Sequence, residues 1–184
     1  FAAMGLFGDL PRIASLSARR MGVPSARNLD VSVTLDLMIH DIDLALALAG
    51  ARPDRVEAQM LENRAGLADH IKAVLHFPGG VTASLESSRV ADERDRVMTI
   101  GYDGGAAVEV DFITRSFENP ACLPLNPDFN ETPMAKDSLG ANVAAFVSAA
   151  RGGDGAAAAD GAAALAALEA ALRIDEACGS RSRV

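Results

Sequence analysis

The sequence predicts an α+β fold, in which a mainly antiparallel β-sheet has helices packed on one of its faces. Between residues 55 and 112, five short segments alternate apolar and polar residues, as strands with one buried face do. Before and after these segments, apolar residues recur at helical spacing. The chain is long enough for one well-buried core and too short for two large ones. A single domain spanning residues 1–184 is therefore expected.

The first part of the chain is expected to form a strand, a loop and a helix. Residues 10–21 are interpreted as the strand and residues 22–33 as the loop. Acidic residues lie in the N-terminal half of the helix, where the helix dipole favours them, and Gly50 is placed to end it. The helix itself is predicted from apolar residues on one stripe: Leu35, Ile39, Ile42, Leu46 and Ala49.

Five strands and two hairpins are predicted for the middle of the chain. The tight-turn sequences Pro78-Gly79-Gly80 and Asp103-Gly104-Gly105 each separate two strands and predict antiparallel hairpins. A meander of about five strands follows, with one apolar and one polar face. The segments are 56–63, 70–77, 81–90, 96–102 and 106–112.

The last third of the chain is expected to form a long connection and two helices. Residues 114–136 are rich in Asn and Pro, and irregular connections of this length are often lids or mobile segments. Residues 137–150 predict one helix, and Asp160 is placed to cap a final helix that runs to about Cys178. The Gly/Ala-rich stretch between the two helices is interpreted as a linker turn.

Charge, cysteine content and missing motifs exclude several classes of function. The net charge of −8 disfavours nucleic acid and anionic membrane surfaces as partners. Cys122 and Cys178 lie far apart, so neither a disulfide framework nor a zinc site is expected, and a cytoplasmic location fits. No apolar run is long enough to span a bilayer, and no secretory signal is visible. Without a strand–GxGxxG–helix unit or a GxxxxGK[ST] loop, the chain is not expected to bind a dinucleotide by itself.

One cluster on the predicted helix has the residues for acid–base chemistry. Asp36 and His40 are four residues apart and Asp43 is three beyond His40, so all three project from roughly one helix face. A carboxylate beside an imidazole fixes its tautomer and favours its cation, which suits a general acid or base near neutral pH. Two alternatives stay open. In the first, His40 is a partly buried structural residue whose ring forms a hydrogen bond with Asp36. In the second, Asp36, His40 and Asp43 bind a metal ion.

Arg89 ends the third strand of the meander and is a candidate for binding a sugar hydroxyl or a phosphate. The alternative is an exposed arginine that pairs with Glu93 or Asp95. His70 and His76 flank another strand on its outward face and are interpreted as structural residues.

The segment DLMIHDIDLALALAG, residues 36–50, resembles the helix that opens the C-terminal domain of the glucose–fructose oxidoreductase / inositol dehydrogenase / MocA (Gfo/Idh/MocA) family. The resemblance is strongest to members that act on nucleotide sugars or inositol-type substrates. It extends over nearly the whole chain, from PRIASLSARRMGVPSARNLDVSV through the strands to DGAAALAALEAALRIDEAC. It implies an open-faced antiparallel sheet that follows an N-terminal Rossmann domain, which this chain does not contain.

The resemblance also implies roles for the candidate residues. His40 would accept the proton of the hydroxyl being oxidised while hydride leaves the same carbon for the nicotinamide. Asp36 would orient His40 or contact the substrate, and Asp43 and Arg89 are candidates for substrate binding. NAD or NADP would be bound mainly by the absent N-terminal domain, so this chain alone is expected to be inactive.

The resemblance implies a homodimer or homotetramer that assembles through the outer sheet face, acting on a sugar or polyol. Two other functions remain open. One is a non-catalytic dimerisation or ligand-binding module derived from the family, and the other is a metal-dependent lyase or hydrolase that uses Asp36, His40 and Asp43. The sequence specifies neither the substrate nor the choice between NAD and NADP, since that choice depends on the absent half.

Overall fold

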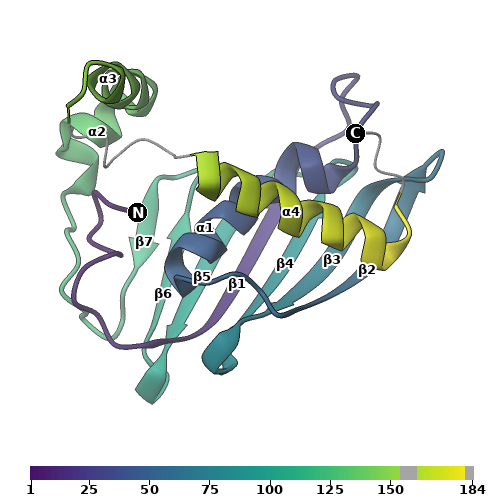
Figure 1. The fold of residues 1–184 in the computed structure, drawn as a ribbon. Coiled ribbons are helices and arrows are strands. Elements are labelled where there is room, and N and C mark those ends of the chain that lie inside the picture. The colour runs from purple at the N-terminus through teal and green to yellow at the C-terminus, as the bar shows by residue number, and fades with distance from the viewer. Residues whose placement is uncertain (154–160, 181–184) are drawn as a thin grey trace. The chain divides into compact units, whose positions relative to one another are not determined.

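A computed structural model describes residues 1–153 and 161–180 of the chain (Figure 1). Two compact units are present. The sheet unit is formed by residues 11–121 and by the chain from residue 164 onward, and the small unit by residues 1–10 and 122–163. The assignment of residues 1–184 to a single domain stays a prediction.

The sheet unit contains a seven-stranded sheet with the order β2-β3-β4-β1-β5-β6-β7. Every strand pair is antiparallel except β1 with β4, which is parallel. The predicted mainly antiparallel open sheet is therefore confirmed. Its strands are β1 (Ile13–Met21), β2 (Arg55–Arg64), β3 (Leu67–His76), β4 (Thr82–Ser88), β5 (Asp95–Tyr102), β6 (Ala107–Asp111) and β7 (Ser116–Glu118).

The predicted five-strand meander is wrong in its strand order. β1, which comes first in the chain, lies between β4 and β5 and separates the two predicted hairpins. The alternation of side chains along β1 marks it as a strand with one buried face, since Leu16 and Ala18 are buried. Alternation does not specify which strand pairs with which, because pairing depends on contacts distant in sequence. β7 lies inside the segment that was predicted to be irregular.

Both predicted hairpins are confirmed. The β3–β4 and β5–β6 pairs are antiparallel, and each turn contains two successive glycines with positive φ. Gly79 and Gly80 have φ values of 77° and 84°, and Gly104 and Gly105 have φ values of 85° and 86°. Glycine reaches this region without the steric cost that a Cβ atom brings, so the two turns are specified locally by their sequences.

Helices α1 (Ile39–Ala49) and α4 (Gly161–Cys178) lie over one face of the sheet, as the ribbon shows for the part of α4 in the sheet unit (Figure 1). The residues that form the buried core come from both helices and from the inner strand face. The opposite, outer face carries small and polar side chains, among them Ser84 and Lys72. The buried core includes Leu16, Ile71, Leu75, Leu85, Met98, Ile100, Ile42, Ala45, Ala171 and Ile174.

The predicted helix that carries Asp36 and His40 does not begin as a regular α-helix. A π-helical turn, Thr34–Met38, precedes α1, so Asp36 lies in the π turn and His40 in the first turn of the α-helix. Single π turns inside α-helices occur often at functional sites. The helix ends as predicted, because Gly50 adopts the left-handed conformation with φ of 64° and donates its N–H to the carbonyl of Leu46.

The small unit contains a 3-10 turn (Phe129–Glu131), α2 (Pro133–Lys136) and α3 (Ser138–Ala150). These turns replace part of the irregular connection that was predicted for residues 114–136. The predicted helix is confirmed in α3, where the Asp137 carboxylate caps the first turn by accepting the N–H of Gly140 at 2.8 Å. Asp160, the predicted cap of the final helix, and most of the predicted linker turn lie outside the described residues.

No helix within residues 1–153 and 161–180 is long and apolar enough to cross a membrane.

Candidate functional site

His40 has an exposed side chain in the first turn of α1. Its ring makes no hydrogen bond or ion pair with any residue that the structure describes. The alternative of a partly buried histidine satisfied by Asp36 is therefore wrong. The ring is exposed, and the Asp36 carboxylate has another partner. An exposed imidazole keeps both ring nitrogens available for proton transfer.

Asp36 lies four residues before His40 and is half-buried. Its Oδ1 accepts a hydrogen bond of 2.6 Å from Nδ2 of Asn28. Asn28 belongs to the loop between β1 and the π turn and has a positive φ of 54°. Asn28 was not among the residues predicted from the sequence, although asparagine is enriched in this conformation and its amide can donate to a carboxylate.

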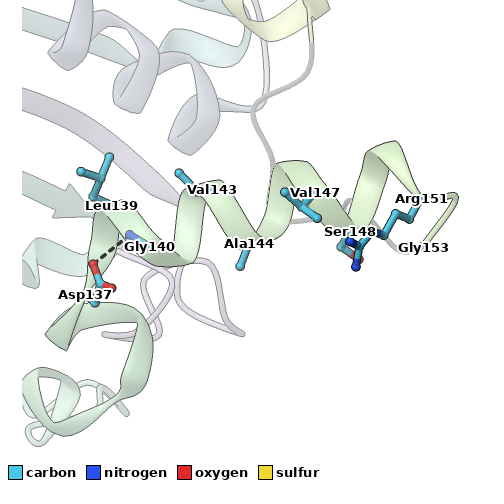
Figure 2. Close-up of a pocket in the computed structure, with 9 residues that line it drawn as sticks. All are labelled: Asp137, Leu139, Gly140, Val143, Ala144, Val147, Ser148, Arg151 and Gly153. Atoms are coloured by element: carbon cyan, nitrogen blue, oxygen red, sulfur yellow. Dashed lines mark hydrogen bonds between the residues drawn. The ribbon is translucent and has the colours of Figure 1, made fainter.

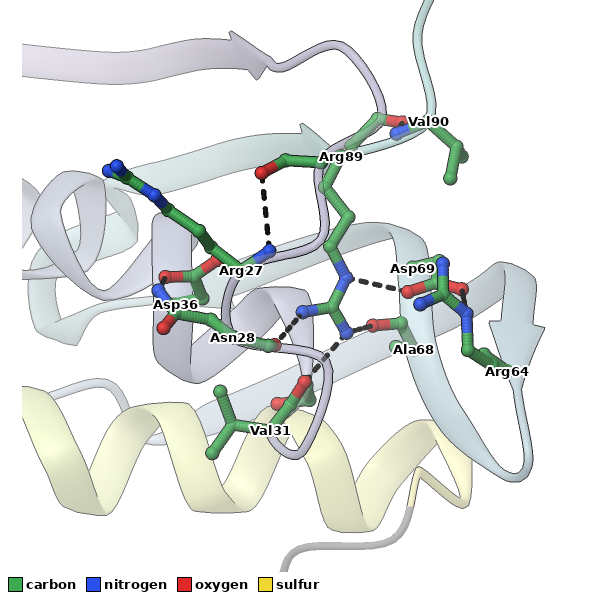
Figure 3. A network of polar contacts seen from close by, with 12 residues as sticks. Arg27, Asn28, Val31, Asp36, Arg64, Ala68, Asp69, Arg89 and Val90 are labelled. Atoms are coloured by element: carbon green, nitrogen blue, oxygen red, sulfur yellow. Dashed lines mark hydrogen bonds and ion pairs between the residues drawn. The ribbon is translucent and has the colours of Figure 1, made fainter.

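Arg89 is buried, and Figure 3 shows its guanidinium surrounded by protein acceptors. Its Nε donates to Oδ1 of Asp69 at 2.6 Å. The two terminal nitrogens donate to two main-chain carbonyls of the loop between β1 and the π turn, Nη1 to Asn28 and Nη2 to Val31, both at 2.6 Å. Nη2 also donates to the carbonyl of Ala68 at 3.2 Å.

The expected alternative of an exposed Arg89 that pairs with Glu93 or Asp95 is wrong. Side-chain exposure is 8% for Arg89 and 7% for Asp69, so this ion pair lies in the core. A guanidinium enclosed in this way favours a structural role over the predicted substrate-binding role, because a ligand needs accessible donors. Arg89 acts on the site through the loop that it holds.

Asp41 follows His40 and points to the other side of the helix, into the core. Nε and Nη2 of Arg20 on β1 each donate to one Asp41 oxygen at 2.7 Å, a bidentate pair. The guanidinium of Arg20 also lies 5.9 Å from the ring centroid of Phe112. The pair ties the first turn of α1 to the sheet.

Arg19, the neighbour of Arg20, pairs with Asp95 instead, because successive strand residues point to opposite faces. The two neighbouring arginines are therefore divided between the two faces of the sheet.

Ser32 provides a second anchor at the start of the helical segment. Its hydroxyl donates to Oδ2 of Asp175 on α4 at 2.6 Å and accepts the N–H of Leu35 at 3.3 Å. Both Ser32 and Asp175 are fully buried. The helix that carries His40 is thus fixed to β1 at Asp41 and to α4 at Ser32.

Asp43, the third member of the predicted cluster, is exposed on α1. It makes no ion pair within the described part of the chain. Among residues 1–153 and 161–180, no group of three or more His, Cys, Asp or Glu residues could hold a metal ion. The metal-dependent interpretation of Asp36, His40 and Asp43 therefore gains no support.

His70 and His76 lie on the outer face of β3, as the strand pattern predicts. Nε2 of His70 is 2.9 Å from Oε1 of Glu86, and Nε2 of His76 is 3.0 Å from Oε1 of Glu57. Each histidine has a carboxylate partner on a neighbouring strand, a cross-strand contact typical of sheets. These pairs are consistent with the structural interpretation.

A groove on the small unit follows one side of α3 (Figure 2). None of the predicted site residues lines it, and its single acidic residue, Asp137, serves as the helix cap. Large apolar side chains of α3 are exposed, with Leu139 at 74% and Phe146 at 68%. The groove therefore lacks a candidate acid or base.

The chain is similar to known proteins over most of its length. Residues 5–108 match the family described as GFO/IDH/MocA C-terminal domain. UDP-N-acetylglucosamine 3-dehydrogenase from Acidithiobacillus ferrooxidans is 33% identical over 141 residues, which are 73% of this chain and 45% of that protein. A solved structure of that dehydrogenase has a TM-score of 0.78 and 29% identity, covering 94% of this chain and 56% of the solved chain.

The WlbA dehydrogenase from Bordetella pertussis, solved in complex with NADH and UDP-GlcNAcA, has the same fold. Its TM-score is 0.69 at 17% identity, with 94% of this chain and 54% of the solved chain covered. This chain spans about half the length of the relatives that it matches.

Proposed function

Since this chain belongs to the GFO/IDH/MocA C-terminal domain family, we propose that it is the substrate-binding and catalytic C-terminal domain of an NAD(P)-dependent oxidoreductase. The substrate class is the hydroxyl group of a sugar, nucleotide sugar or polyol. The relatives at about 30% identity are dehydrogenases of a nucleotide sugar, which makes UDP-N-acetylglucosamine the first compound to test.

The observation that carries this proposal is the state of His40. Its ring is exposed and makes no hydrogen bond or ion pair with the residues that the structure describes, while the helical segment that carries it is anchored through Asp41 and Ser32. A general base needs this combination of an accessible nitrogen and a fixed backbone. In the proposed reaction, a ring nitrogen of His40 accepts the proton of the substrate hydroxyl.

Asp36 is proposed to orient the His40 ring or to bind a neighbouring substrate hydroxyl. Its Oδ1 is held by Asn28, so the carboxylate has a defined orientation. Asp43, which is exposed on α1 like His40, is proposed to bind the substrate through its carboxylate oxygens.

The residues of this chain do not fit a dinucleotide by themselves. The two double-glycine turns close hairpins and do not precede a helix. The π turn that leads into α1 carries Asp36, whose charge opposes a pyrophosphate at a helix N-terminus. We therefore assign NAD(P) binding mainly to the part of the relatives that this chain does not match. The bound cofactor would supply the hydride acceptor.

The outer face of the sheet is proposed to be the surface through which a homodimer or homotetramer assembles. Its central strands present exposed small polar side chains, including Ser17 on β1 and Ser84 on β4, which lie opposite each other in the register. This assembly would explain why the outer face is not covered by helices of the sheet unit.

Replacement of His40 by Asn in the full-length parent protein tests the proposed function. Turnover of UDP-N-acetylglucosamine with NAD⁺ or NADP⁺ should fall by about 100-fold or more, the typical contribution of a general base. The dissociation constant of the cofactor, measured by fluorescence titration, should change less than about threefold. Asp103→Asn, in the exposed turn between β5 and β6, is the control and should keep turnover.

Two outcomes contradict the proposal. Equal losses of cofactor binding and turnover would give His40 a structural role. A parent protein that oxidises no nucleotide sugar, sugar or polyol with either cofactor would favour the alternative, a non-catalytic dimerisation or ligand-binding module.

A further inference from the structure

We propose that Asn28 is a positioning residue for the Asp36 carboxylate and that Arg89 sets the position of Asn28. The proposal rests on the proposed function, in which Asp36 acts beside His40. Asn28 lies in the loop that precedes the π turn, and the buried guanidinium of Arg89 lies against this loop (Figure 3).

The first step is the contact between Asn28 and Asp36. The side-chain amide of Asn28 donates to Oδ1 of Asp36 at 2.6 Å, a short hydrogen bond to a charged acceptor. Asp36 Oδ2 has no partner among the described residues. The amide therefore occupies one oxygen and leaves the other for His40 or a substrate hydroxyl.

The second step is the backbone of Asn28. With φ of 54°, Asn28 is in the left-handed region, which costs energy for most side chains and least for Gly and Asn. This conformation sets the direction in which the side chain leaves the loop. Gly at this position would keep the backbone conformation and remove the amide, whereas Asp would keep the side-chain shape and replace the donor with a negative charge.

The third step is the attachment of the loop to the core. Arg89 donates to the carbonyls of Asn28 and Val31, so one guanidinium holds two points of the same loop. Its own position is set by Asp69 and by the carbonyl of Ala68. Because the planar guanidinium fixes its donors in one geometry, Lys at this position keeps the charge but cannot make all of these bonds.

Steady-state kinetics of the full-length parent protein test the contribution of the amide. Asn28→Gly should lower kcat for UDP-N-acetylglucosamine about tenfold, the kinetic equivalent of one hydrogen bond to a charged group. Asn28→Asp should lower kcat at least as much, because it places a like charge beside Asp36. The KM for the cofactor and the melting temperature of Asn28→Gly should stay at wild-type values. Thr114→Ala, an exposed turn residue of the sheet unit, is the control.

Crystal structures of the parent protein and its Arg89→Lys variant test the geometry without relying on activity. In the wild-type protein, the Asn28 amide should lie within hydrogen-bond distance of Asp36. In Arg89→Lys, the carbonyl of Asn28 should move away from residue 89 and the contact with Asp36 should be lost.

The outcomes separate the two proposals. Full kcat in Asn28→Gly or in Asn28→Asp would refute the positioning role while the proposed function stands. Loss of melting temperature with kcat unchanged would make Asn28 a merely structural residue. A parent protein without oxidoreductase activity would overturn the proposed function, and the crystal structures would still decide whether Arg89 and Asn28 hold Asp36. An Arg89→Lys structure with the Asn28–Asp36 contact intact would refute the role of Arg89.

Discussion

The buried ion pair between Arg20 and Asp41 gives a quantitative test of how the helix that carries His40 is held. The side chains are 11% and 5% exposed, and both Asp41 oxygens accept from the guanidinium at 2.7 Å. Asp41→Asn removes the negative charge and replaces one of the two acceptor oxygens with an amide NH2 group. The buried Arg20 guanidinium then has no charged partner and only one acceptor at this position. Removing one partner of a buried pair costs about 3–5 kcal/mol.

The lower end of that range applies here, because Arg20 retains some exposure and a contact with the Phe112 ring. We therefore expect Asp41→Asn to lower the free energy of unfolding by about 3 kcal/mol. For a chain of this length, that loss corresponds to a decrease in melting temperature of roughly 6–12 °C. Urea unfolding followed by circular dichroism, together with thermal melting, measures both quantities.

Two further variants make the test specific. Asp103→Asn breaks the ion pair with Arg12, whose side chains are 50% and 61% exposed, and should cost at most about 1 kcal/mol. The double variant Arg20→Met/Asp41→Leu removes both charges and should recover part of the loss, since no unpaired charge then remains in the core. A loss under about 1 kcal/mol for Asp41→Asn, or a double variant less stable than either single one, would refute the reasoning.

Two other predictions concern the thiols and the outer sheet face. Burial raises the pKa of the Cys178 thiol, which also donates to the carbonyl of Asp175 at 3.4 Å. Because the thiolate is the reactive form, N-ethylmaleimide at neutral pH should modify the exposed Cys122 before Cys178. Peptide mass spectrometry measures this order, and faster modification of Cys178 would contradict it. Ser84→Arg should shift the parent protein to smaller species in analytical ultracentrifugation, because it places a charge on the proposed assembly face. Thr114→Arg, in the turn before β7, is its control, and an unchanged Ser84→Arg assembly would exclude this face.

The sequence predicted the helix that carries His40, and the family resemblance from which roles for Asp36 and His40 are proposed is confirmed by the comparison. The roles themselves stay predictions. It misjudged Arg89. A lone arginine beside Glu93 and Asp95 looks like a surface residue in sequence, whereas its structural partners are Asp69 and two carbonyls of a loop about 60 residues earlier. A charged residue's burial depends on what packs around it, which local sequence does not encode.

By itself, the sequence determined the features that depend on neighbours along the chain. These are the double-glycine hairpins, the end of α1 at Gly50, the helix α3 and the alternation of faces along the strands. They are local because turn conformation, helix capping and strand alternation require only a few adjacent residues.

Only the tertiary structure decided the insertion of β1 into the centre of the sheet and the pairing of Arg20 with Asp41 and of Ser32 with Asp175. It also decided that the amide of Asn28 donates to Asp36 and that Arg89 donates to the carbonyl of Asn28. These partners lie between 8 and 143 residues apart. Many polar residues of the chain could form these hydrogen bonds and ion pairs. The packing of the whole sheet unit decides which two residues come close enough to do so.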